Sequence, residues 1–141
     1  MAFTNDKAIY LQMADRLCDE ILADTYKDDD RIPSVREYAV LLEVNTNTAV
    51  KAYDELARAN SIYNKRGLGY FVTKGAKKQI MKERKRQFMK THLPELFRQM
   101  RLLGIDIKDV AKKHNLTVDY TYTVKSRAIA QLRKILKDYR S

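Results

Sequence analysis

The segment of residues 31–59, RIPSVREYAVLLEVNTNTAVKAYDELARA, constrains the fold of this chain more than any other stretch. It has the pattern of a short helix, a tight turn at residues 42–45 and a second helix. Ser34 is placed to cap the first helix, and Glu37, three residues later, completes a capping box. Asn45 is placed to cap the second helix. The segment therefore predicts two crossed helices joined by a turn.

Apolar residues of this segment recur at helical spacing, on one face of each helix. The residues that we expect to share a small core are Val35, Ala39, Leu42, Ala49, Ala52, Tyr53 and Leu56. The start of the second helix is instead polar, with Asn45, Thr46, Asn47 and Thr48, and with Lys51 one turn later. Such side chains suit base edges and phosphates in a DNA major groove. A helical hairpin with a solvated polar end is the alternative.

The net charge narrows the kind of partner. The chain has 28 Lys and Arg against 18 Asp and Glu, a net charge of +10, which favours a polyanionic partner. The first 31 residues nevertheless hold 4 basic against 8 acidic side chains, so the positive charge lies further along. Residues 7–24 predict an amphipathic helix with Ile9, Met13, Leu17 and Ile21 on its core face. We expect its acidic face to point away from a nucleic acid.

A short hairpin is predicted after the helix pair. The β-rich segments 62–63 and 70–72 flank a tip in which Gly67 and Gly69 provide the positive φ that a hairpin turn needs. Two strands alone are barely stable, so we expect the hairpin to lie on the helices.

Helix, helix pair and hairpin, in this order, predict a winged helix-turn-helix, whose wing tip reaches the minor groove or phosphates. Lys65 and Arg66 make the tip basic, and a solvated turn is the alternative role for these two cations. The predicted fold class is mainly α with a small β-hairpin. Residues 1–75 would form the winged helix-turn-helix domain, followed by an all-α region in residues 76–141.

Residues 7–74 resemble the DNA-binding domain of the GntR family of bacterial transcription regulators, and the short chain resembles its YtrA-like branch. The resemblance is carried by IYLQMADRLCDEI, RIPSVREYAVLLEVNTNTAVKAYDEL and RGLGYFV. It implies that the Arg of the PSVRE motif and the start of the second helix touch DNA, while a wing glycine approaches the DNA backbone. The candidate DNA-binding residues are Ser34, Arg36, Asn45, Thr46, Asn47, Thr48, Lys51, Lys65, Arg66 and Gly67.

Two positions depart from the family's pattern. Family members commonly have a Pro-Gly turn where this chain has Asp28-Asp29, which predicts a more mobile and more acidic turn. Many members have an arginine where this chain has Val50. The loss of that cation removes one expected phosphate or base contact and predicts a different operator sequence.

The region of residues 76–141 is predicted to be helical. Residues 77–91 form a cationic helix, either a solvated linker or a phosphate contact. Pro94 fits the first turn of a helix that ends at Gly104, and residues 105–114 are again amphipathic. These apolar faces are too many for one small core, which predicts a homodimer, as the YtrA-like branch also implies. The candidate dimerisation residues are Phe88, Leu93, Leu96, Phe97, Met100, Leu103, Ile107 and Val110.

Residues 115–141 extend beyond what the YtrA-like branch implies. Their apolar residues recur mostly at three- and four-residue steps, which is typical of dimer packing. The segments DVAKKHNLT and TVKSRAIAQLRKIL are also similar to the helix-turn-helix of region 4 in sigma factors. A second DNA-reading element is therefore the alternative to dimer packing.

No pattern for catalysis or metal binding is found in the sequence. His92 and His114 have no neighbouring ligands at metal-site spacing, and the wing glycines lack the context of a phosphate-binding loop. We therefore expect no enzyme activity, no metal and no cofactor. The lone Cys18 has the setting of a packing residue. No apolar run spans a bilayer and the N-terminus lacks a signal-peptide core, which predicts a cytoplasmic protein without a membrane partner.

The predicted function is a homodimeric bacterial transcription regulator, a repressor that binds double-stranded DNA at an inverted-repeat operator. The YtrA-like resemblance implies control of a transporter operon, and a small-molecule effector is left open and unidentified. The alternative is a winged-helix module that binds RNA or a protein, since fold does not fix function. Tyr120 and Tyr122, which have no expected core role, would then be candidates for base stacking.

Overall fold

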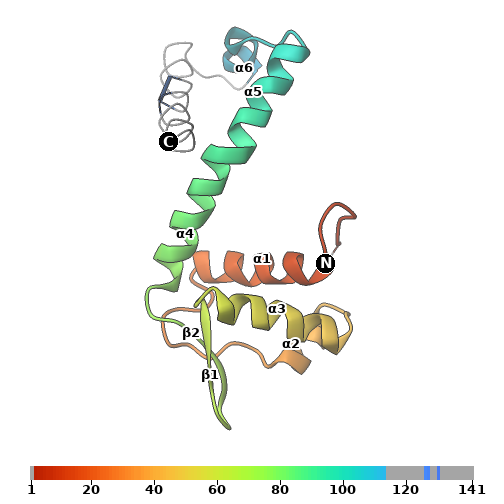
Figure 1. Cartoon of the computed structure of the whole chain (residues 1–141), viewed down its shortest axis with the longest axis vertical. Coiled ribbons are helices and arrows are strands. Elements are labelled where there is room, and N and C mark those ends of the chain that lie inside the picture. Colours follow the sequence, from red (N-terminus) through yellow and green to blue (C-terminus); the bar gives the residue numbers. More distant parts are fainter. Residues whose placement is uncertain (1, 114–125, 128–129, 131–141) are drawn as a thin grey trace, which may run out of the picture. The chain divides into compact units, whose positions relative to one another are not determined.

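The computed structural model describes residues 2–113, 126–127 and 130, and it divides into two compact units, Met1–Lys82 and Glu83–Ser141. The described part is mainly helical with a two-stranded antiparallel hairpin (Figure 1), which confirms the predicted fold class. The elements are α1 Ile9–Leu22, α2 Val35–Leu41, α3 Thr46–Arg58, β1 Ile62–Lys65, β2 Gly69–Val72, α4 Ala76–Gln87, the π-helix η1 Phe88–His92, α5 Leu93–Leu102 and α6 Ile107–Lys113.

Helices α1, α2 and α3 pack their apolar faces against one another in the first unit, where α1 lies beside α3 (Figure 1). The helical spacing of the apolar residues produces this core. Its buried members include Met13, Leu17, Ile21, Tyr38, Ala39, Leu42, Ala49, Ala52, Tyr53 and Leu56. The predicted core residue Val35 is only half-buried. The core position predicted for Ile9 is wrong: this side chain is 45% exposed at the first residue of α1, whereas the later members of its stripe are buried.

The boundaries of α2 and α3 follow from capping side chains, as predicted. The Ser34 hydroxyl accepts a hydrogen bond from the Glu37 backbone N–H (3.2 Å), and the Glu37 carboxylate accepts one from the Ser34 backbone N–H (2.7 Å). The Asn45 carboxamide oxygen accepts a hydrogen bond from the Asn47 backbone N–H at 2.8 Å. Between the helices Glu43 has a φ of 54°, in the left-handed region, which reverses the chain within the predicted turn.

An isolated β-bridge, which the sequence did not predict, joins the wing to the segment before α2. β1 and β2 pair from Ile62 opposite Val72 to Lys65 opposite Gly69. Arg31 forms an antiparallel bridge with Phe71, and the Ile32 N–H donates to the Tyr70 carbonyl at 3.0 Å. The bridge explains how a hairpin of two short strands remains ordered, because β2 also pairs with the chain that leads into α2.

The turn at residues 28–30 is held by hydrogen bonds that the sequence did not predict. The Asp28 carboxylate accepts from the Gly75 backbone N–H (3.1 Å), and the Asp29 carboxylate accepts from the Tyr63 hydroxyl (2.8 Å). Asp29 itself has a φ of 63°, where the family's Pro-Gly turn would place a glycine. The acidic turn is thus tied to the wing and to the start of α4. Its greater mobility stays a prediction.

The first unit continues into α4, because Ala76 and Ile80 are buried in its core. It therefore extends to Lys82, beyond residue 75, and the division into two functional domains at that residue stays a prediction.

The second unit contains the end of α4, η1, α5 and α6. Pro94 lies in the first turn of α5, as predicted. Since proline has no N–H to donate to the carbonyl four residues before it, the turn that precedes Pro94 widens into the π-helix η1. Leu93 and Ala111 are buried. Neither reading of residues 115–141 can be compared with the structure, because all but three of these residues lie outside the described part.

Candidate nucleic-acid-binding surface

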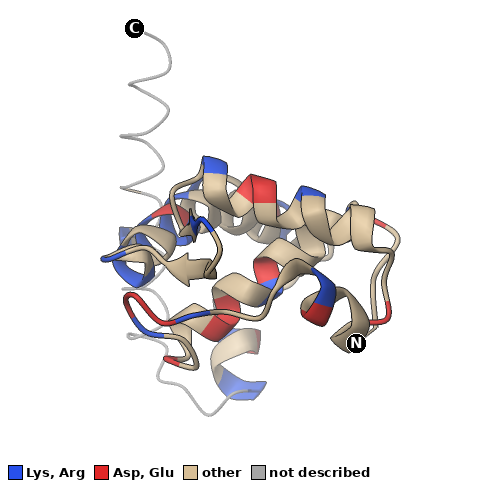
Figure 2. Ribbon diagram, turned by 90° about the horizontal axis from the view of Figure 1, so that it is seen from below, with Lys and Arg blue, Asp and Glu red and all other residues tan. Residues whose placement is uncertain are grey.

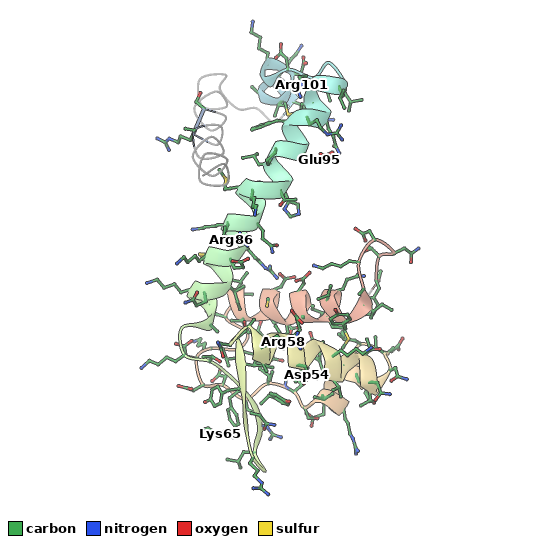
Figure 3. The ribbon with its side chains drawn as sticks, viewed as in Figure 1. Asp54, Arg58, Lys65, Arg86, Glu95 and Arg101 are labelled. Atoms are coloured by element: carbon green, nitrogen blue, oxygen red, sulfur yellow. The ribbon has the colours of Figure 1, made fainter. Side chains whose placement is uncertain are left out.

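Helix α3 has a buried side and a polar side. Ala49, Ala52, Tyr53 and Leu56 face the core, and the opposite side exposes Thr46, Asn47, Val50, Lys51 and Asp54. Of the predicted contact residues on this helix, Thr46, Asn47 and Lys51 are thus exposed, whereas Thr48 is half-buried. Figure 3 shows Asp54 and Arg58 further along the same helix. The polar side combines amide, hydroxyl, cationic and carboxylate groups, which are the groups that distinguish base edges in a major groove.

The start of α2 contributes Ser34 and Arg36. Arg36 is exposed, and the Ser34 hydroxyl is engaged in the capping box. Hydrogen bonds from the Ser34 backbone N–H, and then from its hydroxyl, lower the pKa of Glu37 below its ordinary value of 4.5, since they favour the charged carboxylate. The carboxylate that caps α2 is therefore ionised at neutral pH.

The wing presents Lys65, Arg66 and Gly67, all of them exposed. The Leu68 N–H donates to the Lys65 carbonyl at 2.9 Å and closes the tip. The Lys65 ammonium lies against the sheet, with its nitrogen 4.8 Å from the centre of the Phe71 ring. Lys65 and Arg66 are two of the basic positions coloured blue in Figure 2. Arg66 and Gly67 lie in the turn between the strands, and Lys65 is the last residue of β1; their contacts with DNA stay predictions.

The polar elements share one side of the first unit. Figure 1 shows α2 and the tip of the hairpin on the side of this unit that lies away from α1. The orientation of the acidic first helix away from a nucleic acid stays a prediction. Arg31, which was not predicted as a contact residue, forms the β-bridge to Phe71. Its charge contributes to the lowered pKa of Glu37, as the weakest of four causes.

Other kinds of site have no support in the described residues. Residues 2–113, 126–127 and 130 contain no group of three or more His, Cys, Asp or Glu side chains that could hold a metal ion. Cys18 is half-buried against the core of the first unit. Within the same part of the chain, no helix combines the length and the apolar character that a membrane span requires.

The predicted dimerisation residues differ in exposure. Phe88, Leu96 and Leu103 are exposed, Phe97, Met100 and Val110 are half-buried, and Leu93 is already buried within the chain. The side chain of Ile107 lies outside the described part. Leu102 and Ile105, which were not predicted, add exposed apolar surface to the second unit.

Comparison with known proteins finds relatives along most of the chain. Residues 9–72 match a family model described as bacterial regulatory proteins, gntR family. The HTH-type transcriptional regulator YhcF of Bacillus subtilis is 34% identical over 103 residues, which are 73% of this chain and 84% of YhcF. The HTH-type transcriptional repressor YtrA of the same organism is 33% identical over 100 residues, 71% of this chain and 76% of YtrA.

Solved structures of two regulators resemble the chain beyond the helix-turn-helix. A GntR-family regulator from Bacteroides thetaiotaomicron is 47% identical, with a TM-score of 0.62, over 84% of this chain and 99% of the other. A GntR-family regulator from Listeria monocytogenes is 32% identical, with a TM-score of 0.66, over 82% of this chain and 100% of the other. The likeness therefore includes part of the helical region that follows the wing.

The capping box of α2 predicts a pH-dependent contribution to stability. Because the pKa of Glu37 is lowered on folding, its contribution is complete above pH 4.5 and is lost as the pH falls through the lowered value. We expect Glu37→Gln to lower the thermal midpoint at about pH 7, and we expect the difference from the parent protein to narrow at about pH 3.

Asp54→Asn is the matched control, because it removes one exposed carboxylate to which no hydrogen bond is seen among the described residues. Thermal unfolding followed by circular dichroism measures all three proteins. A Glu37→Gln difference that is as large in acid as at neutral pH would contradict the assigned role of the carboxylate.

Proposed function

The chain belongs to the GntR family of bacterial regulatory proteins, and we propose that it is a homodimeric regulator that binds double-stranded DNA at a specific inverted-repeat operator. The observation that supports this most is the exposed polar side of α3. The opposite side of this helix is apolar and buried in the core that it shares with α2 and the wing. Its relatives are transcription regulators, so the protein is not an enzyme. Its place of action would be the cytoplasm, where bacterial DNA lies.

The proposed docking inserts α3 into the major groove, with Thr46, Asn47 and Lys51 toward the bases and phosphates. Arg36 and the wing would contact the DNA on either side. Two-fold symmetry then places the centres of the two half-sites about 34 Å apart, one turn of the double helix. Because Lys and Arg side chains would neutralise phosphates, the affinity should fall with salt, at a log–log slope of about −0.9 per phosphate.

The regulatory direction is proposed by analogy. YtrA of Bacillus subtilis is described as a transcriptional repressor, and the similarity to YtrA supports a repressor. The YtrA-like resemblance further supports a transporter operon as the target, and an effector would have to be found by experiment. The alternative of RNA binding rested on Tyr120 and Tyr122, which lie outside the described residues.

The homodimer is supported by apolar surface on the second unit. Leu96 is 49% exposed and Leu103 is 72% exposed, and Leu102, Ile105 and Phe88 are also exposed. This is more large apolar surface than one short helical region ordinarily leaves to water, and covering it with a second copy stabilises both chains.

The apolar surface predicts a variant that separates the two chains. We expect Leu96→Asp to convert a dimer into a monomer at micromolar concentration, because a charge would be buried in the interface. Light scattering coupled to size exclusion gives the mass. Leu68→Asp, a matched change at the 60% exposed wing tip, should remain dimeric. A dimeric Leu96→Asp protein would place the interface elsewhere.

Arg36 is predicted to be required for specific binding. Selection from a random duplex pool supplies the operator, and fluorescence anisotropy measures the affinity. We expect Arg36→Ala to weaken operator binding about 5- to 150-fold, a cost of about 1–3 kcal/mol, without lowering the thermal midpoint. Arg58→Ala is the matched control, since Arg58 pairs with Glu55 at 3.1 Å in the last turn of α3. Normal operator binding by Arg36→Ala would show that the proposed docking is wrong.

Val50 is predicted to read the methyl group of a thymine. Its side chain is 40% exposed between polar neighbours on α3, and apolar groups in this setting recognise the thymine methyl. We expect Val50→Ala to weaken operator binding about two- to fourfold, because about one of the two carbon atoms that it removes would be buried against the methyl group, at about 0.8 kcal/mol per CH₂ group. The same variant should have no effect on an operator in which deoxyuridine replaces the contacted thymine.

Val40→Ala is the matched control for this experiment, because Val40 is 78% exposed on α2 and has no proposed contact with DNA. If Val50→Ala weakens binding equally on the thymine and deoxyuridine operators, at every thymine position tested, the proposed methyl contact is absent.

A further inference from the structure

The face of the sheet that points away from the core holds a cluster of side chains, of which only Lys65 is among the candidate DNA-binding residues. Ile32, Ile62 and Val72 are buried on the inner face. Because side chains alternate along a strand, the residues next to them lie on the other face. We call this face the outer wing face, and its members are Arg31, Tyr63, Lys65, Gly69 and Phe71.

Two aromatic rings form the floor of the outer wing face. Tyr63 and Phe71 are opposite each other on β1 and β2, and their rings stack with centres 5.8 Å apart and planes 24° apart. The Tyr63 hydroxyl donates to Asp29 at 2.8 Å, which holds the ring in place. The Lys65 nitrogen lies 4.8 Å from the centre of the Phe71 ring and 5.8 Å from that of Tyr63. Ring faces attract cations, so the floor keeps the ammonium on this face.

Arg31 reaches the same face from the segment before α2, where it forms the β-bridge to Phe71. A Cβ atom built on Gly69 would lie 3.4 Å from the Arg31 Nε and 3.8 Å from its Nη2, so the guanidinium lies over the backbone of Gly69. Gly69 also has a φ of 102°, which L side chains rarely adopt. A residue with a side chain at this position would strain the strand and crowd the guanidinium.

The two cations are therefore neighbours. Arg31 lies over Gly69 and Lys65 lies over Phe71, and same-face positions of one strand are about 7 Å apart. Within the described part of the chain, no carboxylate lies at ion-pair distance from either cation. Two neighbouring like charges with no carboxylate at ion-pair distance favour the binding of an anion.

We propose that Arg31 and Lys65 form a two-cation clamp for one phosphate of the DNA backbone, with Gly69 and Phe71 as positioning residues. The proposal rests on the proposed function, since it adds a backbone contact beside the wing to the docking of α3. The planar guanidinium can donate two parallel hydrogen bonds to phosphate oxygens, and the ammonium supplies a point charge from the other side. A backbone phosphate carries no sequence information, so the clamp fixes the register of the wing and does not select bases.

The test measures how the affinity of the full chain for its selected operator depends on salt. Arg31→Gln and Lys65→Gln each remove a cation while keeping much of the side-chain stem, and the double variant removes both. Lys7→Ala is the matched control, because Lys7 pairs with Asp15 next to α1, on the side proposed to face away from DNA. Anisotropy titrations between about 50 and about 200 mM KCl give the slope of log K against log salt.

If both cations bind a single phosphate, their contributions to the salt slope should not be additive. We expect each single variant to weaken binding about three- to tenfold and to make the slope shallower by up to about 0.9, the value for one phosphate. The double variant should lose no more than about 0.9 in slope. Lys7→Ala should keep the slope of the parent protein.

The positioning role of Phe71 is tested through Lys65. Phe71→Leu keeps an apolar residue in the strand but removes the ring face beneath the ammonium. We expect it to reduce the salt slope as Lys65→Gln does, and to have little further effect in the Lys65→Gln background. If Phe71 has a purely structural role, Phe71→Leu should instead lower the thermal midpoint, and it should weaken binding both in the parent protein and in the Lys65→Gln background.

Three results would overturn the clamp. One is an Arg31→Gln protein with the affinity and slope of the parent; another is a double variant whose slope loss approaches about 1.8, which indicates two separate phosphates. The third is a Phe71→Leu effect that is unchanged by Lys65→Gln. Each result requires that the parent protein binds its operator and that Arg36→Ala weakens this binding, so failure of the clamp is distinguished from failure of the proposed function.

Discussion

The burial of Tyr53 is the interaction on which the DNA-facing geometry depends. This residue of α3 donates its hydroxyl to the Pro33 carbonyl at 2.5 Å, directly before α2. Its ring contacts Tyr38 of α2, with centres 6.1 Å apart, and meets the edge of Tyr70 of β2 at 5.1 Å. Burial raises the pKa of Tyr53, so its hydroxyl remains a donor throughout the physiological range. One side chain thus joins α3 to α2 and to the wing.

The same packing explains why α3 can expose so polar a surface. Ala49 and Ala52 let the helix approach its neighbours closely, and Tyr53 and Leu56 provide most of the buried apolar area. The stability of α3 therefore comes from one side, and the other side is free to carry residues that favour recognition over folding. Val50 and Lys51 lie on that free side next to each other, so a change at either position should alter operator choice more than stability.

The features that could be predicted from the sequence depend on short-range rules. The capping box of Ser34 and Glu37, the Asn45 cap and the hairpin follow from residues a few positions apart, and the structure confirms them. The features that were missed depend on pairing between distant segments: the bridge of Arg31 with Phe71, the burial of Tyr38 and the hydrogen bonds of the acidic turn. The position of the Lys65 ammonium could not be predicted for the same reason, because the rings beneath it come together only in the folded sheet.

The capping residues raise a question of compatibility, since Ser34 and Asn45 were predicted both to cap helices and to contact DNA. The Ser34 Oγ accepts from the Glu37 N–H, and the Asn45 Oδ1 accepts from the Asn47 N–H. Phosphate oxygens require donors. The Ser34 O–H already acts on the Glu37 carboxylate, whereas the capping carboxamide of Asn45 retains its NH₂ group. In Asn45, capping and phosphate binding therefore use different atoms of one side chain. A cap that orders the first turn of α3 also fixes where the donor of Asn45 points.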